Sequence, residues 1–176
     1  MSAGAAVISN AGPLMVLAKL NLLHLLKSLY GRVDFSRSVY TETVIEGMRQ
    51  GYDDAYRLED FFRVENWIPQ EIDLETMATD LREAHLDAGE RDTLGLALAA
   101  SDVLVLMDES AGREIARKHG VRVRGSLGVL VEAHQRGLIG SEQLRAYFAE
   151  MARREDIWVS RALVERLLGE VFADQV

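Results

Sequence analysis

The stretch VLVLM, residues 103–107, is apolar throughout and lies between two aspartates, Asp102 and Asp108. This run is too short for an ordinary helix, and it lacks the alternation of a strand that has one face in water. It therefore predicts a strand that is covered on both faces, as in parallel sheets whose crossover helices pack on either side.

Segments typical of strands and helices alternate along most of the chain. The expected strands are residues 5–8, 32–36, 103–107 and 121–123, and the expected helices span 13–30, 38–48, about 87–101, 110–119 and 127–135. The region 52–70 combines a helical stretch around 58–62 with an extended segment that ends at Pro69. Such alternation favours parallel strands joined by helices. We predict an α/β fold, a three-layer α/β/α sandwich with a mostly parallel central sheet.

The length of the chain limits the number of domains. Its 176 residues, 48% of them hydrophobic, suffice for one compact domain and are too few for two ordinary ones. We expect a single domain over residues 1–176, in which residues 141–176 form a helical C-terminal extension with helices at 141–154 and 160–172.

The composition excludes several classes of site. The chain has no cysteine, which excludes disulfides, thiolate zinc sites and cysteine nucleophiles and is typical of a reducing cytoplasm. No stretch approaches the roughly 20 apolar residues of a membrane span, and no secretion signal begins the chain. The net charge of -8 argues against nucleic-acid binding through a general positive field, although a local basic strip could still contact phosphates. We expect a cytoplasmic protein without membrane contact.

Polar residues follow the expected strands at their carboxyl ends. The first strand is followed by Asn10 and the central one by Asp108 and Glu109. Because ligands of open parallel sheets bind beyond the carboxyl ends of the strands, an amide and carboxylates should converge there. Glu42 and Glu90, on the helices around residues 38–48 and 87–101, are further candidates for a site that the fold assembles.

Each of these residues also has a purely structural interpretation. Asn10 could cap the helix that begins near Pro13. Asp87 and Glu90 have the spacing of a capping box, and Asp108 could cap the helix at 110–119. The residues alone leave these alternatives open.

Four blocks of sequence, taken in order, resemble the PIN-domain family. The blocks are VISNAGPLMVLAKLNLLHLL at 7–26, SVYTETV at 38–44, LDAGERDTLGLALA at 86–99 and LVLMDESAGREIARKHGVRVRGSLGVL at 104–130. Each block alone is weak, but their order and spacing are specific, and the resemblance is strongest over residues 5–140. The PIN fold is itself a three-layer α/β/α sandwich.

The resemblance implies a metal-dependent nuclease, commonly a ribonuclease, and often the toxin of a VapBC-like toxin–antitoxin pair. It implies RNA as substrate, a small basic antitoxin as partner, and assembly into a homodimer or higher oligomer. The matching positions for the ligands of Mg²⁺ or Mn²⁺ and the hydroxyl beside them are Asn10, Glu42, Glu90, Asp108, the adjacent Glu109, and Ser126. Hard divalent cations prefer such oxygen ligands, polarise phosphates and lower the pKa of bound water.

Asn10 departs from the nuclease pattern, which has Asp at this position. An amide offers a carbonyl oxygen but carries no charge and cannot act as a base. We therefore expect weaker metal binding than in the usual site, and a two-ion mechanism is harder to sustain. The alternative function is a catalytically weakened PIN-like module that binds RNA or a protein.

Basic residues cluster just after the central strand. Arg113, Arg117, Lys118, Arg122 and Arg124 form a candidate strip for contacts to RNA phosphates. The same residues also fit a solvated helix face whose basic C-terminal end suits the helix dipole.

Overall fold

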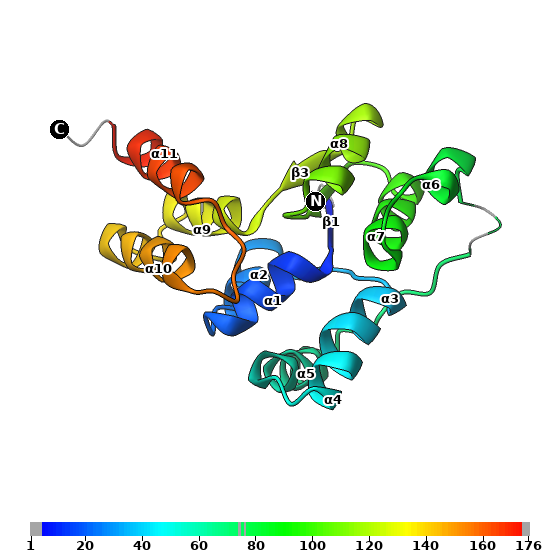
Figure 1. The fold of residues 1–176 in the computed structure, drawn as a ribbon, viewed down its shortest axis with the longest axis horizontal. Helices are drawn as coiled ribbons and strands as arrows, with labels where there is room; N and C mark the ends of the chain where they lie inside the picture. Colours follow the sequence, from blue (N-terminus) through cyan, green and yellow to red (C-terminus); the bar gives the residue numbers. More distant parts are fainter. Residues whose placement is uncertain (1–4, 74, 76, 174–176) are drawn as a thin grey trace. The chain divides into compact units, whose positions relative to one another are not determined.

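In the computed structural model, residues 5–73, 75 and 77–173 are described, and the chain divides into two compact units, Met1–Ser126 and Leu127–Val176 (Figure 1). All strands among the described residues lie in the first unit, and the second is helical. That the two units make a single domain stays a prediction.

The sheet of the first unit has three parallel strands, β1 (Ala6–Ser9), β2 (Val103–Leu106) and β3 (Arg122–Arg124), in the order β1-β2-β3. Ile8 lies opposite Val105, and Val105 opposite Val123. The predicted α/β class with a parallel central sheet is confirmed, and the VLVLM run supplies the middle strand.

The strand predicted at 32–36 is wrong, because only single residues of this segment pair. Asp34 bridges to Ile8, and Ser36 bridges to Gln70. Ser36 then accepts a hydrogen bond from the backbone N–H of Val39 and starts a helix, which ends the extended segment. The parallel pairing thus continues beyond β1 as isolated bridges.

Both faces of β2 are buried, as the apolar run predicts. On one face, Val105 packs with Leu94 and Ala97 of α7 (Ala88–Ala99), in a core to which α6 (Thr79–Glu83) and α8 (Ser110–Lys118) also contribute. Leu104 and Leu106, which point to the opposite face, are buried too. Each fully buried side chain of this kind stabilises the fold by about 1.5–3 kcal/mol.

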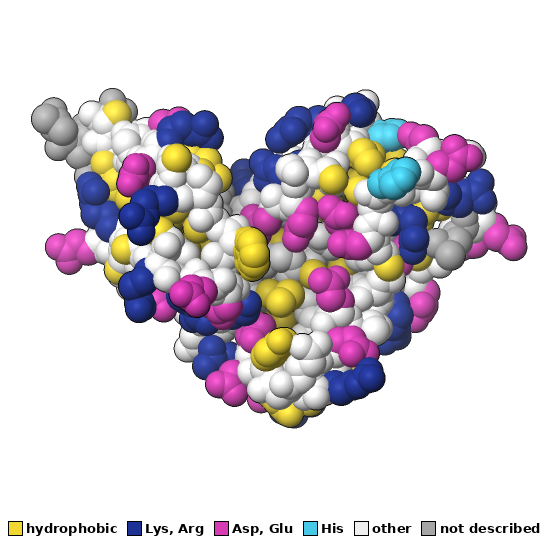
Figure 2. All heavy atoms as spheres, in the orientation of Figure 1, with side chains coloured by type: hydrophobic (Ala, Val, Ile, Leu, Met, Phe, Trp, Pro, Cys, Tyr) yellow, Lys and Arg dark blue, Asp and Glu magenta, His cyan; other side chains and the backbone are white. Residues whose placement is uncertain are grey.

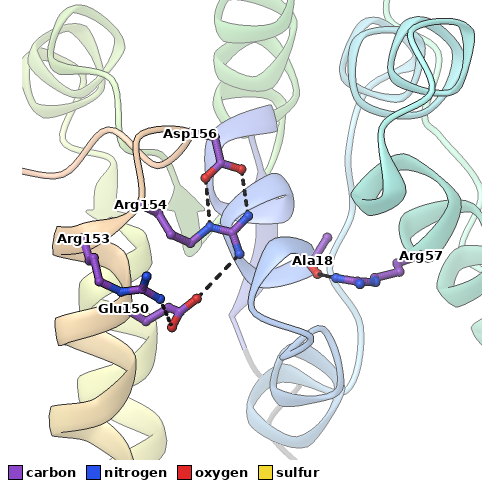
Figure 3. Close-up of polar contacts among 6 residues, drawn as sticks. All are labelled: Ala18, Arg57, Glu150, Arg153, Arg154 and Asp156. Atoms are coloured by element: carbon purple, nitrogen blue, oxygen red, sulfur yellow. Dashed lines mark hydrogen bonds and ion pairs between the residues drawn. The ribbon is translucent and has the colours of Figure 1, made fainter.

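The helix predicted over 13–30 is two helices, α1 (Ala11–Lys19) and α2 (His24–Tyr30). Asn21 between them has φ 58°, a left-handed conformation that ends a helix. Arg57 of α5 (Asp53–Glu65) donates a hydrogen bond of 3.1 Å to the carbonyl of Ala18 and so satisfies an acceptor at the end of α1 (Figure 3).

The helix predicted over 38–48 is present, but its middle is wider than an α-helix. It consists of α3 (Arg37–Tyr40), the π-helix η1 (Thr41–Glu46) and α4 (Gly47–Arg49). π-helical turns are rare and frequently occur at functional sites. Glu42 lies in the first turn of η1.

The second unit consists of α10 (Ser141–Arg153), α11 (Arg161–Phe172) and all of α9 (Ser126–Gln135) except its first residue. These helices match the predicted ones to within two residues. After α10, Arg154 forms a two-bonded ion pair with Asp156, at 2.8 and 2.7 Å, and Glu150 pairs with Arg153 at 3.1 Å (Figure 3). No helix among the described residues has the length and apolar character needed to cross a membrane.

Candidate metal centre

Asn10 lies directly after β1, and its backbone N–H continues the sheet by donating to the carbonyl of Leu106 at 2.9 Å. Its side chain is 2% exposed and makes no capping hydrogen bond to α1, which excludes the capping interpretation. Nδ2 instead donates to Glu109 Oε2 at 3.1 Å. Oδ1 is buried and has no hydrogen-bond partner in the part of the chain that the structure describes.

Gly89, in the first turn of α7, leaves a space that several oxygen atoms surround. A Cβ at this position would lie 3.0 Å from Glu42 Oε2 and 3.1 Å from Asn10 Oδ1. The same point is 3.4 Å from Asp87 Oδ1. Oxygens from η1, from the end of β1 and from the start of α7 therefore converge where glycine has no side chain.

Asp87 and Glu90 form the capping box that their spacing predicts. Asp87 Oδ1 accepts the N–H of Glu90 at 2.7 Å, and Glu90 Oε2 accepts the N–H of Asp87 at 3.2 Å. Burial raises the pKa of Glu90, as do the neighbouring carboxylates of Asp87 and Glu109, against hydrogen bonds from the backbone of Asp87 and Gly112. Glu90 does more than cap α7, because its carboxylate also lies near the carboxylates of Asp87 and Glu109.

Glu42 faces the same group of carboxylates. Desolvation of its carboxylate raises the pKa of Glu42 to about 7, helped by the charges of Asp87, Glu109 and Glu90, although the residue as a whole keeps contact with solvent. Asn10, Glu42, Asp87, Glu90 and Glu109 are called the acidic cluster below. Figure 2 shows acidic side chains gathered on the visible face of the first unit.

Asp108 has a different environment from its neighbour Glu109. Its Oδ1 accepts the backbone N–H of Ser126 at 2.7 Å, and its Oδ2 accepts the hydroxyl of Ser126 at 2.5 Å. Asp108 does not cap α8, whose N-cap position is Glu109. Both carboxylate oxygens of Asp108 are thus engaged by the protein.

The predicted basic strip lies on α8 and β3, and most of it makes contacts within the first unit. Arg113 donates to the carbonyl of Met107 at 2.8 Å, Lys118 pairs with Glu114 at 3.0 Å, Arg122 pairs with Asp102 at 2.7 Å, Arg124 donates to Tyr30 at 3.2 Å, and Arg117 is exposed. Contact of this strip with phosphates stays a prediction.

The donor set of the acidic cluster suits a hard divalent cation, since every donor is an oxygen. Among the described residues, no three Asp, Glu or His side chains stand ready as a ligand set, so an ion would have to draw them together. A cation would give Asn10 Oδ1 a partner, which this buried atom lacks among the described residues, and would reduce the repulsion between Glu42 and Glu90. The residues present therefore fit a divalent ion.

The structure brings together four residues that the sequence proposed for the site, Asn10, Glu42, Glu90 and Glu109. Asp108 accepts hydrogen bonds from Ser126, and its Oδ2 lies near Glu109 Oε1 beside Gly12. Sequence reasoning missed Asp87 as a member and treated it only as a cap. The available signal was its position three residues before Glu90, which places both carboxylates at the start of one helix.

A family model described as a PIN domain matches residues 6–172. No curated protein and no solved structure matches the chain.

Proposed function

The chain belongs to the PIN-domain family, and from this premise we propose that it is a divalent-metal-dependent ribonuclease that hydrolyses RNA phosphodiester bonds at the acidic cluster. The observation that carries the proposal is the buried Asn10 Oδ1, which has no partner among the described residues and faces carboxylates. A buried polar atom without a partner is costly, and a bound cation removes that cost.

Asn10, Glu42 and Glu90 would hold Mg²⁺ or Mn²⁺. When bound, such an ion would supply polarisation of a phosphate and a lowered pKa for the attacking water. Glu90 is held for this task by the N–H of Asp87, at 3.2 Å, and Asn10 by its hydrogen bond to Glu109, at 3.1 Å. Asp108, which the resemblance also places in the ligand set, positions Ser126 after β3.

Cleavage of RNA by the purified full chain tests this function. We expect cleavage with Mn²⁺ or Mg²⁺ and none with EDTA. Glu42→Gln and Glu90→Gln should abolish cleavage and still fold, because glutamine also serves at the third position of a capping box. Glu46→Gln is the matched control, since Glu46 lies in the same π-helix but pairs with Arg49 at 3.0 Å. Equal cleavage by all variants would contradict the proposal.

The finer proposal is that this ribonuclease is the toxin of a toxin–antitoxin pair. The net charge of -8 suits a small basic partner. A short open reading frame for such a protein should lie beside this one, and its product should bind the chain and stop cleavage. A basic neighbour that neither binds nor inhibits would contradict this part of the proposal while leaving the ribonuclease activity in place.

The second candidate is a PIN-like module that binds RNA or a protein without cleavage, and Asn10 favours it because an amide carries no charge. The two functions differ in metal binding. No Mn²⁺ binding at millimolar concentration would favour the binding module, and cleavage that appears only in Asn10→Asp would identify the amide as the cause.

A further inference from the structure

The two polar atoms of the Asn10 side chain face different carboxylates. Nδ2 donates to Glu109 Oε2 at 3.1 Å. Oδ1 points to the space at Gly89, where Glu42 Oε2 lies within 3.0 Å of the same position. The amide therefore stands between Glu109 on one side and the Gly89 space on the other.

The orientation of this amide is fixed by charge. The reverse orientation would place the carbonyl oxygen of Asn10 against the carboxylate of Glu109, which accepts hydrogen bonds and cannot donate one when ionised. Asn10 is 2% exposed, so bulk water does not compensate for that contact. The carbonyl oxygen of Asn10 therefore points to the Gly89 side.

A cation meets opposite conditions on the two sides of the amide. On the Gly89 side it finds the carboxylate of Glu42 and the carbonyl oxygen of Asn10, which has no hydrogen-bond partner within the described part of the chain. Between Asn10 and Glu109 it finds an N–H group, which is hydrogen-bonded to Glu109 Oε2 and presents a positive end to the ion. An aspartate at position 10 would turn this contact into two facing carboxylates, which is an arrangement that attracts a cation.

Resting on the proposed metal-dependent function, we propose that Asn10 limits the acidic cluster to one divalent ion, bound on the Gly89 side through ligands that include Asn10 Oδ1 and Glu42, and that the amide N–H holds Glu109 out of the ligand set. The Asn10 N–H then occupies the position between Asn10 and Glu109 where a second cation would otherwise bind. Asn10 is then the residue that sets the metal stoichiometry of the site.

The number of bound ions tests this directly and needs no RNA. Isothermal titration of the full chain with Mn²⁺, together with electron paramagnetic resonance of free Mn²⁺, should count one ion in the unmodified protein and two in Asn10→Asp. Two ions in the unmodified protein, or one in Asn10→Asp, would overturn the inference and leave the proposed function standing. No bound ion in the unmodified protein would overturn both.

A second pair of variants keeps the test decisive if Asn10→Asp fails to fold. Glu42→Gln should lower the affinity for the single ion at least tenfold more than Glu109→Gln, because only Glu42 is a ligand. Circular dichroism checks that both variants fold, and Glu46→Gln serves as the control for loss of a charge outside the acidic cluster. Equal losses in the two variants would overturn the inference.

Discussion

Asp108 and the acidic cluster, both at the carboxyl edge of the sheet, differ in whether the protein supplies hydrogen-bond donors to their oxygen atoms. Asp108 accepts two hydrogen bonds from Ser126, at 2.7 and 2.5 Å, so the protein itself supplies its partners. In the acidic cluster, Glu42 faces other carboxylates, and a buried oxygen of Asn10 has no partner among the described residues. The comparison indicates that the fold alone accounts for the position of Asp108, whereas the acidic cluster fits a bound cation.

The largest expected effect is on Mn²⁺ affinity, which should depend on the acidic cluster and hardly on Asp108. Glu42→Gln should lower Mn²⁺ affinity by about 100-fold, at the upper end of what loss of a metal site's supporting groups costs. Asp108→Asn should change it less than about threefold, because Asp108 already has protein donors. Isothermal titration measures both. Equal losses would show that the two groups of carboxylates act as one site.

Filling the space at Gly89 should weaken metal binding while the protein still folds. In Gly89→Ala, the added methyl would lie 3.0 Å from Glu42 Oε2 and 3.1 Å from Asn10 Oδ1, so we expect Mn²⁺ affinity to fall about tenfold. The variant should still fold, because the preference for alanine over glycine in a helix, about 0.5–1 kcal/mol, opposes the cost of these close contacts. Gly169→Ala in α11, where a Cβ meets nothing within 4 Å, is the matched control. Unchanged affinity in Gly89→Ala would place the ion elsewhere.

The pH dependence follows from the raised pKa of Glu42, about 7. Glu42 must lose its proton to bind a cation, so Mn²⁺ affinity should rise about fivefold from pH 6 to pH 7 and level off near pH 8. Without metal the sign reverses: the folded state holds the Glu42 proton more tightly than the unfolded chain, so stability falls as pH rises from about 4.5 to 7 and is flat above. Denaturant titrations across this range should show that fall in the unmodified protein and a smaller fall in Glu42→Gln, in which only the raised pKa of Glu90 contributes.

The smallest effect concerns the satisfied group. Ser126→Ala removes one donor from Asp108 and should lower the free energy of unfolding by about 1–2 kcal/mol. Chemical denaturation at constant pH measures it. A Ser126→Ala protein as stable as the unmodified chain would mean that Asp108 is free to act with the acidic cluster.

Much of the sheet and part of the site follow from local sequence. The apolar run at 103–107 predicts a central strand, and the rule that strand ends meet at one edge places Asn10 near the residues after β2. The capping box of Asp87 and Glu90 is likewise a short-range pattern.

The remainder depends on contacts between distant segments. The end of α1 accepts a hydrogen bond from Arg57 of α5, far along the chain, and the π-helical turn of Glu42 has no local sequence signal. Which of the adjacent acids Asp108 and Glu109 faces Asn10 depends on the backbone after β2 and on Ser126, far along the chain. Periodicity and strand-end position cannot distinguish two neighbouring carboxylates.

Thermal unfolding with and without Mn²⁺ tests most directly that the acidic cluster holds a cation. At 100 times the dissociation constant, a bound ion stabilises the folded state by about 2.7 kcal/mol, which corresponds to a rise in Tm of roughly 5–10 °C. We expect that rise in the unmodified protein and none in Glu42→Gln at the same Mn²⁺ concentration. No rise in the unmodified protein, or the same rise in Glu42→Gln, would contradict a cation at this site.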